Sequence, residues 1–218
     1  MRQAISAAAA AELIPDGATL LIGGFMGVGS PLRLIDALVA AGRKDFTVIA
    51  NDTAMPGRAI GKLVAAGAVS KAIVSHIGLN PKTQAKMIAG EMDVELVPQG
   101  TLVERIRAGG VGLGSVLTAT GIGTPVEEGN EKVEVNGKQY LIEMPIKGDF
   151  ALLAASRADY VGNLEFSLTA HNFNPVMALA AETVIAEPTN IVPVGVIPPD
   201  AVKTPGILID HLIERAPV

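Results

Sequence analysis

Cysteine is absent from this sequence of 218 residues, and its absence excludes several chemistries at once. The chain can form no disulfide, no thiolate metal site and no cysteine nucleophile. Its histidines, His76, His171 and His211, show no H-x-x-x-H or H-E-x-x-H spacing, so we expect no metal site. A G-x-S-x-G motif is missing too, which leaves serine hydrolase chemistry without support.

Positive charge and long apolar runs are also scarce. Lys and Arg number 17 against 22 Asp and Glu, and no basic patch with interleaved aromatic residues occurs, so we expect no nucleic acid partner. No apolar run approaches the roughly 18 residues that a membrane span needs, and no membrane association is expected. Gln3 and Glu12 interrupt the alanine-rich start, which favours an amphipathic helix over a signal peptide and hence a cytoplasmic protein.

Apolar residues are plentiful, at 49% of the chain, and this is enough for one full core. We therefore expect residues 1–218 to form a single domain. Apolar, β-branched runs alternate with helical patterns, and this order predicts an α/β fold: an open, mostly parallel, doubly wound Rossmann-like sheet with helices on both faces. The first four strands are expected at residues 20–22, 46–50, 72–75 and 94–97.

The second half of the chain is less regular. Asn136-Gly137 lies within the alternating residues 131–143 and predicts a β-hairpin outside the main sheet. Further strands are expected at residues 150–155 and 183–186, with Asn174-Pro175 opening a helix between them. Six prolines from Pro188 onward predict a tail that runs over the surface or a partner and ends in a short element at residues 207–213.

One stretch carries the main functional signal. Four glycines separate the first strand from the next helix: Gly23, Gly24, Gly27 and Gly29. Ser30 is expected to cap that helix and Pro31 to take its first position. Glycine permits the close approach of a ligand, and free N–H groups at a helix start favour anions. Two nucleotide-binding motifs nevertheless fail, because Leu32 replaces the third glycine of G-x-G-x-x-G and Ser30-Pro31 replaces the Lys-Ser/Thr of a P-loop.

The segment from Asp16 to Pro31 resembles, at every specified position, the first signature of the family I coenzyme A-transferases. That signature is an acidic or Asn residue, Gly, two free positions, three aliphatic residues, Gly-Gly-Phe, three free positions, Gly, one free position and Pro. Further segments resemble the alpha (A) subunit of this family: residues 49–54, 97–102, 105–110, 120–124 and 170–175. The resemblance covers essentially the whole chain and is strongest to the acetate/acetoacetate CoA-transferase alpha subunits.

The resemblance implies an activity that is shared between two subunits. Such enzymes move CoA between a short-chain acyl- or 3-oxoacyl-CoA and a carboxylate acceptor, of the acetoacetyl-CoA/acetate type, by a ping-pong route. The nucleophile is a glutamate in a Ser-Glu-Asn-Gly-type turn of the beta (B) subunit, and it forms a glutamyl-CoA thioester. No such string occurs here, and Glu128, in Glu-Glu-Gly-Asn, has no neighbouring donors or base. We therefore expect no catalytic residue in this chain, CoA as a substrate, no permanently bound cofactor, and a heterotetramer of two alpha and two beta subunits.

The resemblance also implies the positions that meet the substrates. The CoA-binding segment corresponds to Gly23, Gly24, Phe25, Met26, Gly27, Val28 and Gly29. Asn51 and Gln99 correspond to polar residues of the acyl and carboxylate pocket, although Asn and Gln at loop starts also often satisfy backbone groups. Because each follows a predicted strand, Asn51, His76 and Gln99 are expected to share one rim with the glycines.

The roles of Phe25, His76 and His171 stay open at this point. Phe25 is either a core residue under the glycine loop or a ligand contact. His76 is favoured as a hydrogen-bonded structural residue over a pocket residue. His171 precedes Asn172 where the family usually has a basic residue before Asn-Phe-Asn or Asn-Phe-Gly, and this departure leaves the electrostatic role of the position open.

Two alternative functions are compatible with the same residues. A subunit for 3-oxoadipate or another dicarboxylate needs a cation near the pocket, and Arg58 and Arg105 are the nearest candidates in sequence. A chain without its own nucleophile also fits a non-catalytic CoA- or acyl-binding module, because a fold alone does not determine function.

Overall fold

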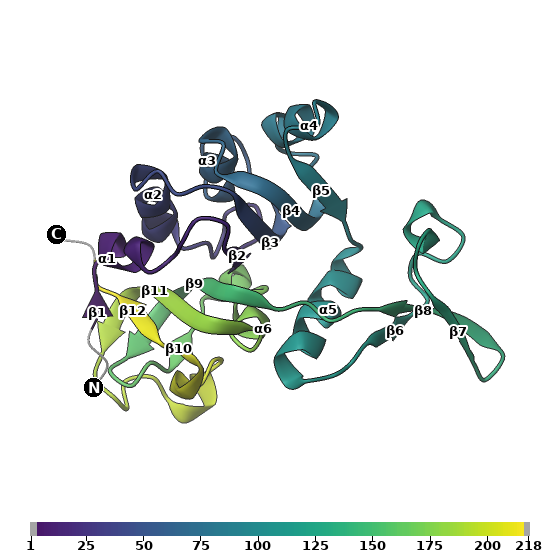
Figure 1. Cartoon of the computed structure of the whole chain (residues 1–218). Coiled ribbons are helices and arrows are strands. Elements are labelled where there is room, and N and C mark those ends of the chain that lie inside the picture. Colours follow the sequence, from purple (N-terminus) through teal and green to yellow (C-terminus); the bar gives the residue numbers. More distant parts are fainter. Residues whose placement is uncertain (1–3, 216–218) are drawn as a thin grey trace.

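The computed structural model describes residues 4–215, and within them a nine-stranded sheet forms the centre of the molecule (Figure 1). Eight strands follow the order β1-β12-β11-β9-β2-β3-β4-β5, and every neighbouring pair along this path is parallel. The ninth, β10, pairs antiparallel with β9. The strands are β1 (Ala4–Ile5), β2 (Thr19–Ile22), β3 (Phe46–Asp52), β4 (Val69–His76), β5 (Asp93–Leu96), β9 (Gly148–Asp159), β10 (Leu164–Glu165), β11 (Ala181–Val192) and β12 (His211–Ile213).

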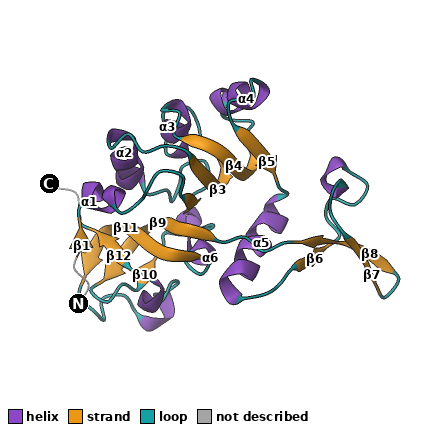
Figure 2. Cartoon of the chain, viewed as in Figure 1, coloured by secondary structure: helices purple, strands orange, loops and turns teal. Residues whose placement is uncertain are grey.

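Helices cover both faces of this sheet, as Figure 2 shows. On one side lie α1 (Ala7–Glu12), α2 (Leu32–Ala40), α3 (Ile60–Ala65) and α4 (Pro81–Ile88), and on the other lie α5 (Gln99–Val111) and α6 (Asn174–Met177). Successive strand residues point to opposite faces, so in β2 Leu20 and Ile22 enter one core while Leu21 enters the other. Continuous apolar runs are needed where a parallel sheet is buried on both faces. The predicted α/β fold is therefore confirmed.

The direction of winding reverses between β2 and β9. From β2 the chain proceeds through β3 and β4 to β5, whereas from β9 it proceeds to β11 and β12 on the other side. The pairing of β2 with β9 ends at Ile22 and Leu152, and β9 continues to Asp159 beside β11. In open parallel sheets, ligands bind at the carboxyl ends of the strands around such a reversal. The glycine loop begins at this point.

A separate arm projects from the end of α5 in Figure 1. It contains β6 (Val116–Thr118), β7 (Lys132–Val135) and β8 (Lys138–Glu143), paired antiparallel in the order β6-β8-β7, with a short 3-10 helix, η1 (Pro125–Glu127). Asn136 and Gly137 form the predicted hairpin turn, with φ angles of 52° and 74°. Arg105 attaches the arm, because its guanidinium pairs with Glu95 at 3.0 Å and its Nε donates to the Met144 carbonyl at 2.8 Å.

The predicted tail from Pro188 is wrong at its start, whereas the short element expected at residues 207–213 is confirmed as β12. Residues 188–192 continue β11, and β12 inserts between β11 and β1, with Leu212 and Ile213 buried. Proline is tolerated within β11 because β12 pairs only with Ile185 and Ala186, which leaves one edge of β11 free beyond them. The remaining short 3-10 helices are η2 (Leu168–His171), η3 (Pro199–Ala201) and η4 (Gly206–Leu208). No helix among residues 4–215 is long and apolar enough to cross a membrane.

Candidate functional site

The glycine loop after β2 folds back on itself in a tight turn. The backbones of Phe25 and Val28 exchange two hydrogen bonds of 3.0 and 2.9 Å, which leaves Met26 and Gly27 at the tip. Both tip residues have positive φ angles, 51° for Met26 and 82° for Gly27, as a primed two-residue turn requires. A left-handed conformation is costly for methionine, so the surrounding structure must hold this turn in place.

Three of the glycines are required by the packing of the loop against its own protein. A Cβ at Gly23 would lie 1.9 Å from Asn174 Oδ1, and a Cβ at Gly24 would lie 2.0 Å from Ser30 Oγ. At Gly29 the nearest atom is the Ala170 carbonyl oxygen, at 2.7 Å. The space that we expected a ligand to use at these three positions is thus filled by side chains and backbone of this chain.

Three side chains from two distant segments hold the loop. Asp52, at the end of β3, accepts the Met26 N–H at 2.8 Å. Asn172 closes the loop, since its Oδ1 accepts the Gly24 N–H at 3.1 Å and its Nδ2 donates to the Val28 carbonyl at 3.0 Å. The fully buried Asn174 donates to the Gly29 carbonyl at 2.9 Å and accepts the N–H of Ala154 in β9 at 3.1 Å. Each element that borders the reversal point therefore contributes to the shape of the loop.

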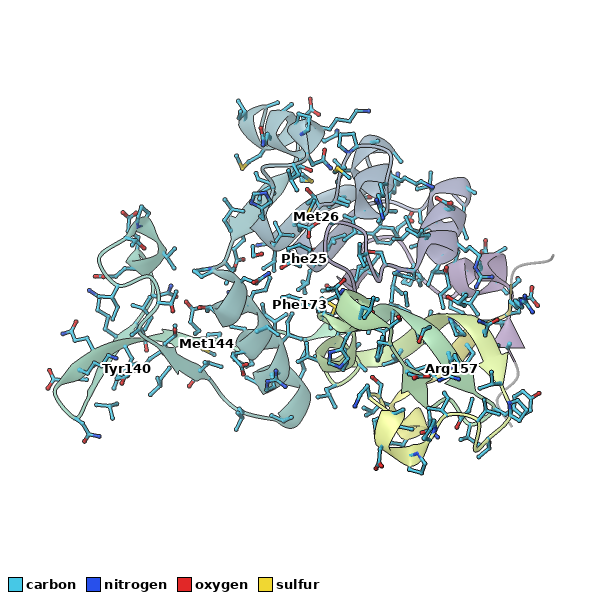
Figure 3. All side chains as sticks on the ribbon, turned by 180° about the vertical axis from the view of Figure 1, so that it is seen from behind. Phe25, Met26, Tyr140, Met144, Arg157 and Phe173 are labelled. Atoms are coloured by element: carbon cyan, nitrogen blue, oxygen red, sulfur yellow. The ribbon has the colours of Figure 1, made fainter. Side chains whose placement is uncertain are left out.

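Phe25 does not fill the core under the loop, because 44% of its surface is exposed. Figure 3 labels Phe25 and Met26 on the loop, and Phe173 on the segment that leads into α6. It is Phe173, only 6% exposed, that belongs to the core on this side of the sheet. Of the two interpretations of Phe25, the core residue is wrong, and a contact with a ligand or a partner stays a prediction.

Asn51 and Gln99, predicted from separate strands, are in contact. Gln99 Nε2 donates to Asn51 Oδ1, and the Asn51 amide in turn donates to Asp52 Oδ2 at 2.7 Å. Asn51 is only 2% exposed, and Ser75 Oγ also donates to its backbone carbonyl at 2.7 Å. Gln99 is exposed at the start of α5. Within this pair, Gln99 is the member that solvent or a substrate can reach.

The side chains of His76 and His171 form no hydrogen bond with any described residue. His76, at the end of β4, is exposed, and its ring lies against Gly78, so the hydrogen-bonded interpretation is not what the structure shows. His171 packs edge-on against Phe166, with ring centroids 5.5 Å apart. Neither contact assigns a charge-dependent role to either histidine.

A cavity of about 850 Å³ opens beside the glycine loop, where β9 and β11 continue past the end of β2. The glycine loop and the start of α2 form one side, and β9 and β11 form another. The lining residues are Gly27, Val28, Gly29, Ser30, Leu32, Arg33, Arg58, Ala154, Ala155, Ser156, Ser167, Ala170, Glu187, Pro188, Thr189, Asn190 and Arg215. Its size suits a small organic molecule or part of a larger one.

The start of α2 is not free to bind an anion from solution. Pro31, not Ser30, is the N-cap residue, and its side chain makes no capping hydrogen bond. The Glu187 carboxylate from β11 caps the helix, since its two oxygens accept the N–H groups of Arg33 at 3.1 Å and Leu34 at 2.8 Å. The predicted Ser30 cap is therefore wrong, and a carboxylate of this chain already occupies the expected anion site.

Comparisons with known proteins identify the family of this chain. The family model for coenzyme A transferase matches residues 4–215. This chain belongs to the coenzyme A transferase family. It is 54% identical over 198 residues to acetate CoA-transferase subunit alpha of Escherichia coli K12, covering 91% of this chain and 90% of that relative. The acetoacetyl-CoA:acetate/butyrate CoA transferase alpha subunit of Clostridium acetobutylicum is 49% identical over 200 residues, 92% of each chain.

A solved coenzyme A transferase structure has the same fold. The acyl-CoA transferase YdiF of Escherichia coli O157:H7, in a thioester complex with CoA, superimposes with a TM-score of 0.87 at 25% identity. The match covers 97% of this chain but 47% of the YdiF chain, so this chain spans about half of that protein. The family predicted from the sequence is confirmed.

Sequence reasoning missed three polar residues of this coenzyme A transferase chain. Asp52 and Asn174 hold the glycine loop, and Glu187 caps α2. Asp52 directly follows Asn51 at a predicted strand end, so its position was a usable signal. Asn174 was expected only to open a helix. Glu187 accepts the N–H of Leu34, which lies 153 residues away in the sequence, so no local pattern could connect these two residues.

Proposed function

We propose that this chain is the alpha subunit of a CoA-transferase that moves CoA between a short-chain acyl- or 3-oxoacyl-CoA and a carboxylate, of the acetoacetyl-CoA/acetate type. The observation that carries the proposal is the 54% identity to an acetate CoA-transferase subunit alpha over 90% of that relative. The name of that relative implies a second subunit. We further propose that the assembly contains two alpha and two beta subunits, and that it is cytoplasmic.

The proposed reaction requires a carboxylate nucleophile, which we assign to a glutamate of the beta subunit. Its attack on the acyl-CoA carbonyl expels the CoA thiolate and leaves an acyl-glutamyl anhydride. The thiolate then attacks the glutamyl carbonyl, which releases the first carboxylate and leaves the glutamyl-CoA thioester. The acceptor carboxylate then passes through the same two steps in reverse. Each attack develops an oxyanion, which needs hydrogen-bond donors in fixed positions.

In this chain, Gln99 and the glycine loop are the groups proposed to meet the substrates. The Gln99 amide has two N–H donors, of which one contacts Asn51, so the other is available to an acyl or carboxylate oxygen. Residues 23–29 are proposed to contact CoA. The contacts of the loop with Asp52 and Asn172 support this role, because a turn fixed before binding loses little entropy when a ligand arrives.

Exposed apolar side chains support the proposed partner. They lie on the glycine loop, on the segments that follow β3 and β4, and on η2, and their exposed fractions are 44% for Phe25, 40% for Val28, 36% for Met55, 42% for Leu79 and 91% for Leu168. Large apolar side chains gathered at one end of a molecule are typical of a surface that a partner covers. We propose that the beta subunit covers this end and so completes the active site.

The test compares acetoacetyl-CoA consumption, with acetate as acceptor, for this chain alone, for its beta subunit alone and for the mixture. We expect turnover only in the mixture, together with a hydroxylamine-sensitive glutamyl-CoA thioester on the beta subunit. Full turnover by this chain alone would contradict the division of labour. An inactive mixture that still binds CoA would instead favour a non-catalytic binding module.

One observation keeps the dicarboxylate alternative as a second candidate. Arg105 is unavailable to a substrate, because its side chain is 15% exposed and pairs with Glu95 and Glu143. Arg58, however, lines the cavity beside the glycine loop and could meet a second carboxylate. We expect a dicarboxylate enzyme to use succinate or 3-oxoadipate at least as well as acetate, and a clear preference for acetate would contradict this alternative.

A further inference from the structure

The cavity beside the glycine loop has more positive than negative charge. Three arginines and one glutamate line it, Arg33, Arg58, Arg215 and Glu187, whereas the whole chain has a net charge of −5. Arg33 and Glu187 neutralise each other in an ion pair of 3.3 Å. Arg58 and Arg215 form no ion pair with any described residue. The cavity is thus an electropositive site on an acidic protein.

The backbone on both sides of Arg58 is strained. Ala54 and Ala59 are alanines with positive φ angles of 53° and 44°, and both are buried. Alanine adopts such angles only at a cost of roughly 1–3 kcal/mol, which the surrounding structure must offset. The loop also packs closely against α3, because a Cβ on Gly61 would lie 2.1 Å from the Met55 carbonyl oxygen. Both ends of the loop that presents Arg58 are therefore buried and depend on the surrounding packing for their conformation.

One carboxylate connects this loop to the glycine loop. Asp52 Oδ2 accepts the Met26 N–H at 2.8 Å, and Asp52 Oδ1 accepts the Ala54 N–H at 2.7 Å. Arg58 lies directly over the tip of the glycine loop, where its Nε would be 2.9 Å from a Cβ on Gly27. The backbones of the two loops are thus joined through Asp52, and the Arg58 side chain lies beside the glycine turn on the side of the cavity.

Arg215 reaches the cavity because Arg33 fixes the segment before it. The Arg33 guanidinium donates to the Glu214 carbonyl at 2.6 Å, and its Nε contacts Glu187. Arg33 is thus engaged with Glu187 and the Glu214 carbonyl, whereas Arg58 and Arg215 line the cavity without an ion pair to a described residue. Guanidinium groups bind phosphate and carboxylate oxygens through paired hydrogen bonds.

We propose that this cavity binds the anionic oxygen group of a substrate and that Arg58, with Arg215 as a second cation, contacts it. The inference rests on the proposed function, because a CoA-transferase offers two such groups, a phosphate of CoA and a carboxylate of the acceptor. Arg58 then determines specificity in a chain that contributes no nucleophile.

The test uses the assembled complex of this chain with its beta subunit, as wild type and as Arg58→Gln, which removes the charge but keeps a polar side chain. Calorimetry measures the affinities for CoA, for pantetheine, which lacks the phosphates, and for succinate. Steady-state kinetics gives KM for acetate and succinate. Arg107→Gln is the matched control, because Arg107 is an exposed arginine of α5 that pairs with Glu104 and does not line the cavity.

We expect Arg58→Gln to weaken one ligand roughly tenfold or more, as the loss of a charge-assisted hydrogen bond does. Weaker CoA binding with unchanged pantetheine binding would identify a phosphate. A raised acceptor KM or weaker succinate binding, with unchanged CoA binding, would identify a carboxylate. Affinities and KM values within about twofold of wild type and of Arg107→Gln would overturn the inference.

Two further comparisons keep the outcome decisive. If Arg58→Gln fails to assemble, Arg215→Gln tests the same cavity from a segment outside the strained loop, and its expected loss is about threefold or more. An unchanged affinity in that variant would then overturn the inference. Binding does not require turnover. An inactive wild-type complex whose CoA affinity depends on Arg58 would therefore contradict the proposed function and support the inference that the cavity binds an anionic group.

Discussion

Two tight turns in this protein have the same backbone form but opposite origins. Asn136-Gly137 in the arm and Met26-Gly27 in the glycine loop both place two successive residues at positive φ. The arm turn uses the residues that favour this conformation, and a Cβ on Gly137 would meet nothing within 4 Å. The glycine loop places a methionine there and relies on Asp52 and Asn172. A turn held by distant side chains is typical of a functional site, whereas a locally encoded turn only connects two strands.

The largest difference between the glycine loop and the arm should appear when each gains one methyl group. We expect Gly23→Ala to lower the free energy of unfolding by at least about 3 kcal/mol, because the new Cβ displaces Asn174 and breaks its hydrogen bonds. Gly137→Ala should cost about 1 kcal/mol, the penalty of a left-handed alanine in open space. Urea denaturation of both variants measures the difference, and equal losses would contradict the contrast.

A smaller effect is expected when the carboxylate that holds the glycine loop is removed. Asp52→Ala leaves three donors without their acceptor, the N–H groups of Met26 and Ala54 and the Asn51 amide, and should lower the free energy of unfolding by about 2–3 kcal/mol. Asp149→Ala is the control, because this exposed aspartate accepts the Thr19 N–H at the opposite end of the sheet. We expect it to cost about 1 kcal/mol or less, again by urea denaturation. A loss of stability for Asp149→Ala as large as that for Asp52→Ala would contradict the special role of Asp52 in holding the glycine loop.

The smallest effect concerns pH and the arm. The pKa of the Glu127 carboxyl lies below its usual range because Lys132 hydrogen-bonds to it, and the Gly123 N–H adds to the shift. A lowered folded pKa means that this carboxylate stabilises the arm above its unfolded pKa and loses that effect as the pH falls through the folded value. Thermal melts should therefore show Glu127→Gln slightly below wild type at pH 7 and equal to it in acid. A difference in melting temperature between Glu127→Gln and wild type that grows as the pH falls would contradict this prediction.

Sequence patterns were sufficient where short-range chemistry decides the structure. Leu20 to Ile22 predicted a buried strand, and Asn136-Gly137 predicted a hairpin turn, because apolar runs and turn residues act locally. The rule that parallel strands end at one rim also predicted that Asn51 and Gln99 lie at the same end of the sheet, where the structure shows them in contact.

The patterns were insufficient where a distant side chain replaces a local one. Ser30 has the chemistry of a helix cap, but Glu187 takes that place because β11 lies beside α2 in the fold. A distant side chain also explains why the expectation that the glycines make room for a ligand was not met at Gly23. Asn174 fills the space at Gly23, and nothing near Gly23 in the sequence indicates it.

The shared carboxylate of Asp52 also has a consequence for motion. A single rotation of this side chain breaks both hydrogen bonds, so one event releases the Met26 and the Ala54 amides together. Local opening events of this kind determine how fast backbone amides exchange with solvent deuterium. The glycine turn and the Arg58 loop would then open as one cooperative unit, with a common rate that a bound substrate slows for both.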